Sequence, residues 1–252
     1  MKNTFKKLIT AAFATALMLT SNVTATTAQD LTENKQQKME ARREAQEAAR
    51  VLSAMMKKPD DFIPRELLER AHAIAIIPDV VKAAFIVGGR GGDGVVARRT
   101  ANGWSVPVYY DIGGASFGVQ IGAKKTDYIM LFMNEGSLRD LLDENVEFGG
   151  DVSFAAGPVG RTAGVGTNPT LDVGILIWSL SQGAFVGASV KGAVLTADND
   201  VNRAVYGMTA EEVLANPEKV KMNDLPKEIK KLSETVARYA GNKTMTDSAI
   251  NQ

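Results

Sequence analysis

Several adjacent pairs of basic side chains could hold phosphate. The doublets considered for such a site are Arg42-Arg43, Lys57-Lys58, Arg98-Arg99 and Lys124-Lys125. A guanidinium can donate to two phosphate oxygens at once, and an ammonium adds a compact positive charge. Near an anionic membrane each basic side chain contributes about 1 kcal/mol. Because exposed charge is common on soluble proteins, the doublets indicate a phosphate site only where the fold brings several of them to one side.

Acidic side chains cluster between residues 140 and 151, where paired carboxylates could support glycoside hydrolysis. The cluster consists of Asp140, Asp143, Glu144, Glu147 and Asp151. Nothing in the sequence places a partner acid on a facing strand, so a solvated acidic face is favoured over an active site. The chain has no Cys and a single His, at position 72. These counts exclude thiol catalysis, disulfides and metal centres built from Cys or several His, and we predict no catalytic residue.

Two further motifs resemble ligand-binding loops. Residues 89–94 satisfy G-x-G-x-x-G, but a strand-like segment follows where a dinucleotide site needs a helix. We interpret this motif as a tight glycine-rich connection between two strands. Residues 198–202 begin like a calcium loop, yet Arg203 and Thr209 stand where Gly and Glu are required. An Asx turn with a helix cap is favoured, and we predict no cofactor, nucleotide or metal.

The N-terminal segment predicts export. Three lysines precede an uncharged apolar run from Leu8 to Leu19, and small residues follow up to Ala28. This is the layout of a secretory signal peptide, and the run is shorter than the roughly 20 residues of a membrane span. We predict a signal peptide over residues 1–28, with no following Cys to carry lipid, and a periplasmic or secreted mature chain.

Both ends of the mature chain predict helices. Residues 31–58 are rich in helix formers, with Ala, Leu and Met at helical spacing, so we expect an amphipathic helix ended by Pro59. A short helix over Arg65–Ala71 should follow. Near the C-terminus, Thr209 and Glu212 form a capping box, and Asp224 and Pro226 open a last helix with one apolar stripe.

The middle of the chain predicts an antiparallel β core. Of 23 glycines, 21 lie between Gly88 and Gly192, so turns should be frequent there. We expect Pro78 to end a strand over Ala73–Ile77, a turn over Lys124–Asp127 and a hairpin across Ser181–Gly183. Alternation predicts two shared strand faces, one of Trp104, Val106, Val108 and Tyr110 and one of Phe117, Val119, Ile121 and Ala123. A helix around Leu138, Leu141 and Leu142 interrupts the strands.

These elements define the fold class. Helices, then strands, then helices indicate an α+β protein with an antiparallel β sandwich or barrel core, flanked by N-terminal and C-terminal helices. No linker is visible, so we predict one domain over residues 29–252. The 29 basic and 29 acidic side chains balance, which leaves no large field to steer the protein onto nucleic acid.

Several short motifs follow one another between Leu52 and Leu214. They are AHAIAIIP (71–78), GDGVVAR (92–98), GWSVP (103–107), GVQIG (118–122) with Asp127 soon after, GGD (149–151), AAGPVGR (155–161) and NRAVYG (202–207). Their order and spacing together resemble the SYLF-domain family. This resemblance implies a non-enzymatic lipid-binding domain at a membrane surface. Family members bind phosphoinositides and other anionic phospholipids, and some eukaryotic members also bind actin and remodel membranes.

The resemblance and the basic doublets together give a site prediction. In eukaryotic members a basic amphipathic segment at the domain's N-terminus contributes to lipid binding, and residues 38–58 occupy that place here. A helix packed on the β core explains the same pattern equally well. We predict anionic phospholipid in the cell envelope as the partner. The expected lipid-binding residues are Arg42, Arg43, Lys57, Lys58, Arg98 and Lys124.

Three other functions stay open at this point. A carboxylate-dependent hydrolase would gather the acids around Asp143–Asp151 into a cleft and raise their pKa values. An outer-membrane β-barrel would explain the glycine-rich alternating strands, although the helical start and the charged helical end argue against it. A structural or stress-related envelope protein would bind another protein in a complex for which lipid does not compete.

Overall fold

The structure is a computed structural model that describes residues 31–58, 63–143, 145–149, 153–158, 173–181, 184–185 and 190–241. Side chains are described for these residues except 83–88, 116–123 and 184–185. The predicted signal peptide, Glu144, Asp151 and the predicted face of Phe117, Val119, Ile121 and Ala123 lie outside this description. No helix within the described ranges is both long and apolar enough to cross a membrane.

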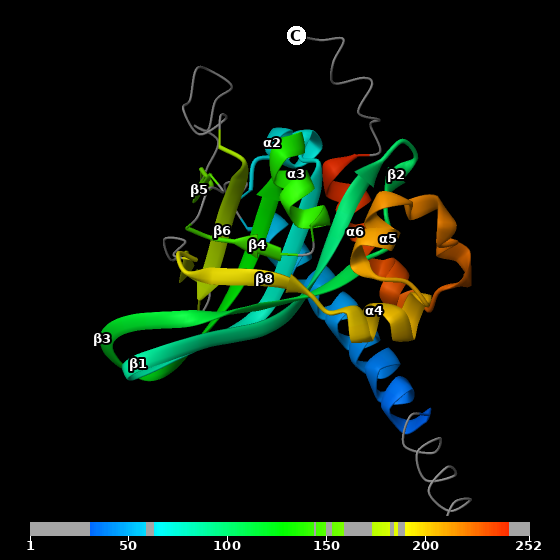
Figure 1. Ribbon diagram of the computed structural model, residues 1–252. Helices are drawn as coiled ribbons and strands as arrows, with labels where there is room; N and C mark the ends of the chain where they lie inside the picture. Colours follow the sequence, from blue (N-terminus) through cyan, green and yellow to red (C-terminus); the bar gives the residue numbers. More distant parts are fainter. Residues whose placement is uncertain are drawn as a thin grey trace, which may run out of the picture.

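The core is a curled mixed β-sheet with helices on both faces (Figure 1). Eight strands pair in the order β2-β1-β3-β6-β5, while β4 pairs with β8, β8 with β3 and β7 with β6. All described pairs are antiparallel except β5 with β6. The predicted α+β class with a barrel-like core and flanking helices is confirmed.

Two very long strands build most of this sheet. β1 (Ala73–Thr100) and β3 (Val108–Phe132) are antiparallel from the pair Ala73↔Phe132 to the pair Val96↔Val108. We call this pair the β1–β3 ribbon. In Figure 1 the ribbon runs out to a bend and returns, so that its two halves lie against each other. A Cβ built on Gly94 would lie 2.9 Å from Ile77 Cα, 17 residues earlier in the same strand.

The ribbon overturns three predictions. Pro78 does not end a strand, because a register shift between Ile77 and Val80 forms a bulge that accommodates a residue without an N–H. Residues Lys124–Asp127 do not turn, since β3 continues through them. Residues 89–94 are part of continuous β1 rather than a connection between strands, although a strand does follow the motif, as we predicted against a nucleotide site.

The shorter strands extend the ribbon at both ends. β2 pairs with the end of β1, and β6 pairs with the end of β3. β6 and β7 form the predicted hairpin through the pairs Leu180↔Phe185 and Ser181↔Ala184. The bounds are β2 (Gly103–Trp104), β4 (Asn145–Glu147), β5 (Phe154–Ala156), β6 (Ile175–Ser181), β7 (Ala184–Phe185) and β8 (Ala193–Ala197).

The helices begin where side chains satisfy their free backbone N–H groups. Asn134 and Ser137 form a capping box on α3, and Thr209 and Glu212 form the predicted one on α5. Asp198 accepts from two backbone N–H groups of α4, which confirms the predicted Asx cap. An N-terminal helix spans residues 31–56. The other bounds are α2 (Arg65–Arg70), α3 (Glu135–Leu142), α4 (Asn199–Tyr206), α5 (Ala210–Ala215), η2 (Pro217–Lys219), η3 (Met222–Asp224) and α6 (Lys227–Ala240).

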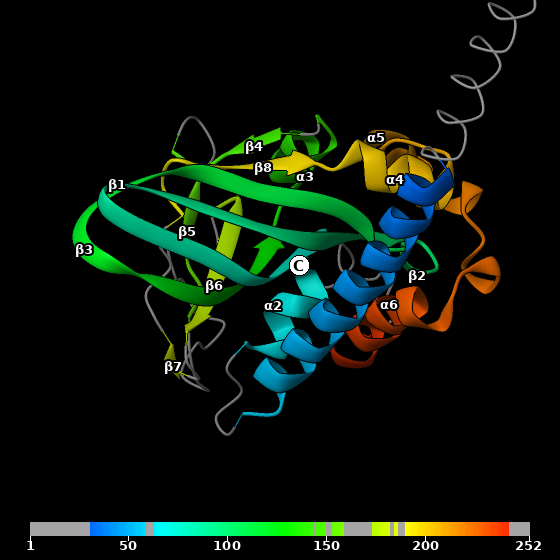
Figure 2. The ribbon, with the colours of Figure 1, turned by 90° about the horizontal axis from the view of Figure 1, so that it is seen from below.

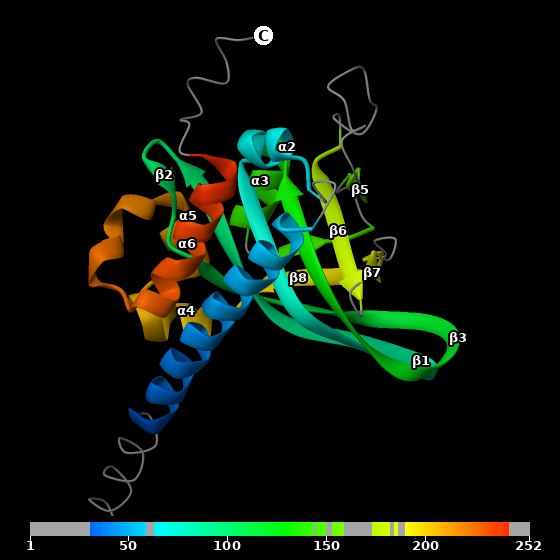
Figure 3. The same cartoon turned by 180° about the vertical axis from the view of Figure 1, so that it is seen from behind.

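Alternate residues of the strands face two separate hydrophobic clusters. Ile129 and Leu131 face the cluster covered by the N-terminal helix, α2 and α6, whereas Met130 and Phe132 face the cluster covered by α3 and α5. Figures 2 and 3 show the N-terminal helix lying along the sheet beside α2 and α6. Its Ala45, Ala48, Leu52 and Met55 are fully buried, so in this structure the helix is docked on the core.

One predicted strand face is wrong. Val106, Val108 and Tyr110 belong to the cluster under α3 and α5, but Trp104 packs in the opposite one. The reason is that residues 105–107 leave the strand between β2 and β3, which breaks the two-residue alternation.

Asn202 joins α4 to β3 through two hydrogen bonds, and we expect its replacement to destabilise the fold. Its side chain accepts from Tyr109 N and donates to Tyr109 O, both at 3.0 Å, and the residue is fully buried. Asn202→Ala leaves a buried backbone N–H without its partner, so we expect the free energy of unfolding to fall by about 2–3 kcal/mol. Urea denaturation measures this. The exposed Asn223→Ala is the control, and an equal loss in both variants would contradict the assignment.

Candidate functional site

A cavity of about 860 Å³ is lined by residues from the end of β1, β2, α3 and the segment from the end of α5 to η3. Its polar walls carry three arginines, two glutamates and the single histidine, while α3, η3 and the residues beside them supply apolar side chains. We call it the arginine pocket. Its lining includes His72, Arg98, Arg99, Trp104, Val106, Glu135, Leu138, Arg139, Leu142, Glu218, Val220 and Met222.

Arg99 forms a rigid inner wall of the arginine pocket. It is 4% exposed, and it donates from Nε to Ala71 O and from Nη2 to Leu68 O, both at 2.9 Å. Its guanidinium carbon lies 4.4 Å from the centre of the Trp104 ring, a cation–π contact. Burial lowers the pKa of Arg99, yet an arginine stays charged at neutral pH. The pocket therefore keeps one fixed buried positive charge.

Arg98 and Arg139 face the same cavity from two different elements. Arg98 is half-buried on β1 and donates from Nη1 to Leu214 O at 2.6 Å, while its backbone N donates to Ser105 Oγ. Arg139 is exposed on α3. Burial lowers the pKa of His72, so this histidine is neutral at pH 7. With Glu135 and Glu218 opposing three arginines, the lining carries a net positive charge of one.

A second cavity of about 680 Å³ separates the N-terminal helix from α6. Four basic side chains and three glutamates line it. No apolar side chain larger than alanine contributes to its lining, which makes it a polar surface groove. The charged lining residues are Arg43, Arg50, Lys227, Lys231, Glu47, Glu228 and Glu234.

The six predicted lipid-binding residues are distributed over several surfaces. Arg42 and Arg43 are exposed in the middle of the N-terminal helix, and Arg43 pairs with Glu40 at 3.5 Å. Lys57 and Lys58 follow the end of that helix, about 20 Å away at 1.5 Å per residue. Lys124 is exposed on β3 opposite Lys82. Of the six, Arg98 lines the arginine pocket and Arg43 the groove beside α6.

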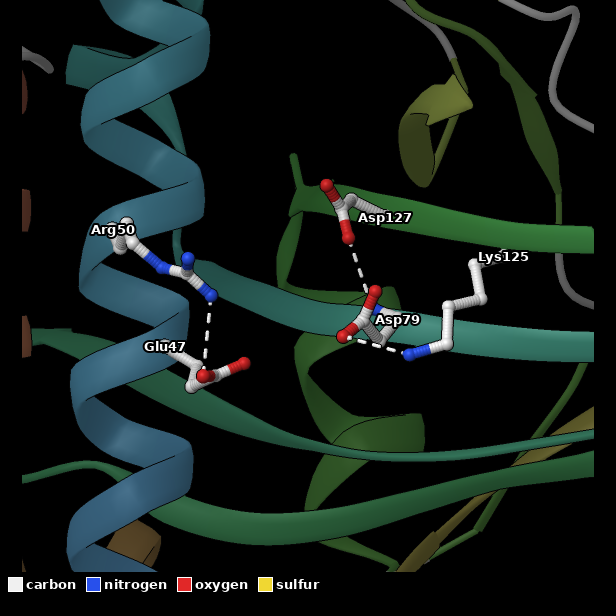
Figure 4. Close-up of polar contacts among 5 residues, drawn as sticks. All are labelled: Glu47, Arg50, Asp79, Lys125 and Asp127. Atoms are coloured by element: carbon white, nitrogen blue, oxygen red, sulfur yellow. Dashed lines mark hydrogen bonds and ion pairs between the residues drawn. The ribbon is translucent and has the colours of Figure 1, made fainter. Parts of the chain in front are cut away.

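A bulge in β1 brings charged residues of three segments together (Figure 4). Asp79 has a positive φ of 51°, and its backbone N donates to Asp127 Oδ1 at 2.9 Å. Its carboxylate pairs with Lys125 at 3.2 Å. Arg50 of the N-terminal helix pairs with Glu47 at 3.1 Å. Burial raises the pKa of Asp127, and the hydrogen bond from Asp79 and the charge of Arg50 oppose this increase. Asp127 therefore holds the bulge backbone, a structural role.

Five acids that were not predicted as site residues meet where the N-terminal helix crosses the β1–β3 ribbon. Glu40 and Glu44 lie one turn apart on the helix, Asp93 and Asp111 are register partners, and Asp198 caps α4. Oxygens of Glu40, Glu44 and Asp93 lie within 4.8 Å of one another. We call these residues the crossing acids. Their one local signal is the i, i+4 spacing of two glutamates.

Crowding changes the acidity of this cluster. Burial, followed by Asp93 and Glu40, raises the pKa of Glu44 from 4.5 to about 8. Partial burial, followed by Asp198 and Asp93, raises the pKa of Asp111 from 3.8 to about 6. Asp111 therefore ionises below neutral pH and Glu44 only above it, so Glu44 adds its negative charge to the cluster above neutral pH.

The described acids of the segment that a hydrolase would use do not converge. Asp140 is on α3, Asp143 caps that helix and Glu147 is exposed on β4. Burial and Asp143 raise the pKa of Asp140. Among the described residues, the acids that converge closely enough to share an ion are crossing acids rather than these.

Comparison with known proteins places the chain in a family. The family model Ysc84, described as "Las17-binding protein actin regulator", matches residues 113–239. The chain belongs to the Ysc84 family. The resemblance to SYLF-domain proteins is thereby confirmed. The match begins in β3 and ends in α6, so the Ysc84 region includes Arg139 of the arginine pocket.

Curated relatives extend the match toward the N-terminus. Protein YSC84 of Saccharomyces cerevisiae is 34% identical over 188 residues, which is 70% of this chain and 40% of the relative. LAS seventeen-binding protein 3 of the same species is 32% identical over 183 residues, 68% of this chain and 40% of the relative. The human SH3 domain-containing YSC84-like protein 1 is 30% identical over 170 residues, 65% of this chain and 49% of the relative. The matched region spans about half or less of each relative.

Proposed function

We propose that this Ysc84-family protein binds anionic phospholipid at a membrane surface of the cell envelope, without catalysis. The arginine pocket is the observation that carries the proposal. It joins three arginines to an apolar lining within one cavity of about 860 Å³. A phospholipid has the matching chemistry, because a phosphate needs charge-assisted donors and the adjoining glycerol and first methylenes need apolar contact. The envelope location rests on the predicted signal peptide.

The three arginines would contribute to phosphate binding in different ways. Arg99 is held by two backbone carbonyls and Trp104, so it supplies a fixed field rather than a flexible donor. Arg139 is exposed on α3 and can swing toward a phosphate at the mouth. Arg98 lines the same cavity, and one of its guanidinium nitrogens already donates to Leu214 O. Arg139 is therefore the residue to test first.

The N-terminal helix has a smaller role in this proposal than the sequence alone suggests. Its apolar face, including Leu52 and Met55, is buried against the sheet. Insertion into lipid would require undocking and exposure of that face, which costs about 25 cal/mol per Å². Arg42 and Arg43 remain available for contact with a membrane surface, because both are exposed.

Liposome co-sedimentation of the protein tests the proposal. We expect binding to vesicles with anionic phospholipid, no binding to neutral vesicles, and weaker binding at high salt. Arg139→Glu should weaken binding roughly thirtyfold, because it replaces a positive charge with a negative one and each charge is worth about 1 kcal/mol at a membrane. Arg98→Gln should weaken it by roughly fivefold.

Two controls make this test specific. Arg65→Glu reverses an exposed charge on α2, outside the arginine pocket, and should change binding by about twofold or less. The pair Arg42→Glu and Arg43→Glu tests the helix doublet separately. Equal losses in Arg139→Glu and Arg65→Glu would show a diffuse charge effect and would defeat the pocket model.

A protein partner is the second candidate function. The matching family model is described as Las17-binding, and two yeast relatives are named for YSC84 and for LAS seventeen binding. If this chain acts in the same general way, it should form a stable complex with another protein. Anionic vesicles added in excess would then fail to displace that partner.

A further inference from the structure

We propose that the crossing acids form a Ca²⁺ site that ties the N-terminal helix to the β1–β3 ribbon. The ligand set is Glu40 and Glu44 from the helix and Asp93 from β1, with Asp111 and Asp198 close by. This site is separate from the arginine pocket and does not depend on lipid binding.

The spacing of the three carboxylates fits one cation. Their nearest oxygens all lie within 4.8 Å of one another, which is the span of two Ca²⁺–oxygen bonds of 2.3–2.6 Å placed on opposite sides of an ion. Two ligands are one helical turn apart on a single face of the helix. The third comes from the strand directly beneath, so the site bridges two elements far apart in sequence.

Glu44 is the observation that points to a ligand rather than to a chance group of acids. The residue is 8% exposed. None of the described residues donates a hydrogen bond to its carboxylate or forms an ion pair with it. Its carboxylate nevertheless points at two other acids. The residue as a whole is nine-tenths buried, while its carboxylate oxygens are not among the fully buried unpartnered atoms, so an ion can reach them from solvent. A carboxylate in this position without a counter-charge is costly, and a bound cation supplies the missing charge.

The surroundings of the cluster favour a hard cation. All candidate ligands are carboxylate oxygens, which suit Ca²⁺, Mg²⁺ and Mn²⁺ and disfavour softer metals. Asp111 is the register partner of Asp93 and adds a further negative charge. Arg43 pairs with Glu40 at 3.5 Å, but its side chain is 62% exposed and can move away into solvent. Ca²⁺ tolerates irregular geometry better than Mg²⁺, which matches ligands drawn from a helix and a strand.

The proposed ion would act as a clamp on the docked helix. Without it, Glu40 and Glu44 repel Asp93 and Asp111 across the interface between helix and ribbon. When Ca²⁺ is bound, the same carboxylates are attracted to one positive ion. Ca²⁺ should therefore raise the unfolding temperature of the protein and protect the backbone amides of the N-terminal helix from hydrogen exchange.

The experiment is a Ca²⁺ titration of the EDTA-stripped protein, followed by calorimetry and thermal unfolding. We expect saturable binding of one Ca²⁺ with a Kd of roughly 10⁻⁵ to 10⁻³ M. Unfolding should shift upward by about 5 °C at 100 times the Kd. Asp93→Asn should lower the affinity at least tenfold, since it removes one charged ligand at a surface position.

Matched variants separate the site from general charge effects. Asp224→Asn removes an exposed acid of η3 and should leave Ca²⁺ binding unchanged. Glu44→Gln should abolish the thermal shift, and hydrogen exchange of residues 31–56 reports the clamp directly. The proposal is overturned if Ca²⁺ gives no saturable binding, if Asp93→Asn and Asp224→Asn bind it equally, or if only Mg²⁺ or Mn²⁺ binds.

Discussion

A Gly94→Ala variant is expected to lose about 3 kcal/mol of folding stability. Gly94 lies where the two halves of the β1–β3 ribbon meet. A Cβ there would lie 2.7 Å from Ile76 O and 2.9 Å from Ile77 Cα. Both are backbone atoms of the same strand, so no side-chain rotation relieves the overlap. Either the halves of the ribbon separate or the strand distorts, and overpacking of this kind commonly costs 1–3 kcal/mol or more.

Gly113→Ala is the matched control for this variant. Gly113 is on β3 in the same ribbon, and a Cβ built on it would meet nothing within 4 Å. Alanine also loses less backbone entropy than glycine on folding. We therefore expect a change within about 0.5 kcal/mol, or a slight stabilisation. Urea unfolding of both variants decides the matter, and equal stabilities would mean that the ribbon halves are not held this closely.

The glycines of residues 89–94 have a structural role, because two of them lie where the halves of the β1–β3 ribbon pack together. The G-x-G-x-x-G pattern is followed by strand residues rather than by a helix, which is the local structure that the sequence predicted. The role of these glycines depends on the bend of the ribbon. Only in the bent strand does Gly94 lie against Ile76 and Gly92 against Val80. Both contacts join segments more than ten residues apart in one strand, so a short sequence motif cannot predict them.

Local physical signals predicted most of the other elements. The capping box of Thr209 and Glu212, the Asx cap at Asp198 and the apolar stripe of α6 each depend on residues within one or two turns. Strand lengths were not predictable in the same way. Pro78 is an ordinary strand terminator, and it was tolerated because Asp127 holds the bulge backbone from 48 residues away.

The candidate site was predictable only in part, for the same reason. The doublet Arg98-Arg99 was visible in the sequence, but the two side chains have different environments, one half-buried at the cavity and one fixed under backbone carbonyls. Arg139 stands alone in its segment and carries no doublet signal. The crossing acids come from the helix, two strands and a helix cap, so their convergence is a property of the tertiary structure.

Glu44→Gln is expected to stabilise the protein in EDTA by about 3 kcal/mol at pH 7 and by about 1 kcal/mol at pH 5. The folded-state pKa of Glu44 is about 8 against an ordinary 4.5. Between these values the folded chain holds a proton that the unfolded chain has released, so wild-type stability falls as pH rises. Glutamine stays neutral at every pH and removes this loss. The measurement is urea denaturation of both proteins from pH 5 to pH 8.

Wild type and Glu44→Gln also distinguish the electrostatic cost of the Glu44 carboxylate from the stabilisation by a bound cation. The exposed Glu66→Gln on α2 is the control and should stay within about 0.5 kcal/mol of wild type at each pH. If the free energy of unfolding of Glu44→Gln changed with pH in parallel with that of wild type, Glu44 would not have the raised pKa. In Ca²⁺ at 100 times the Kd the advantage of Glu44→Gln at pH 7 should nearly vanish, because the ion stabilises by about 2.7 kcal/mol only the protein that retains the Glu44 carboxylate. A gain that persists unchanged in Ca²⁺ would mean that Glu44 is a buried acid which binds no ion.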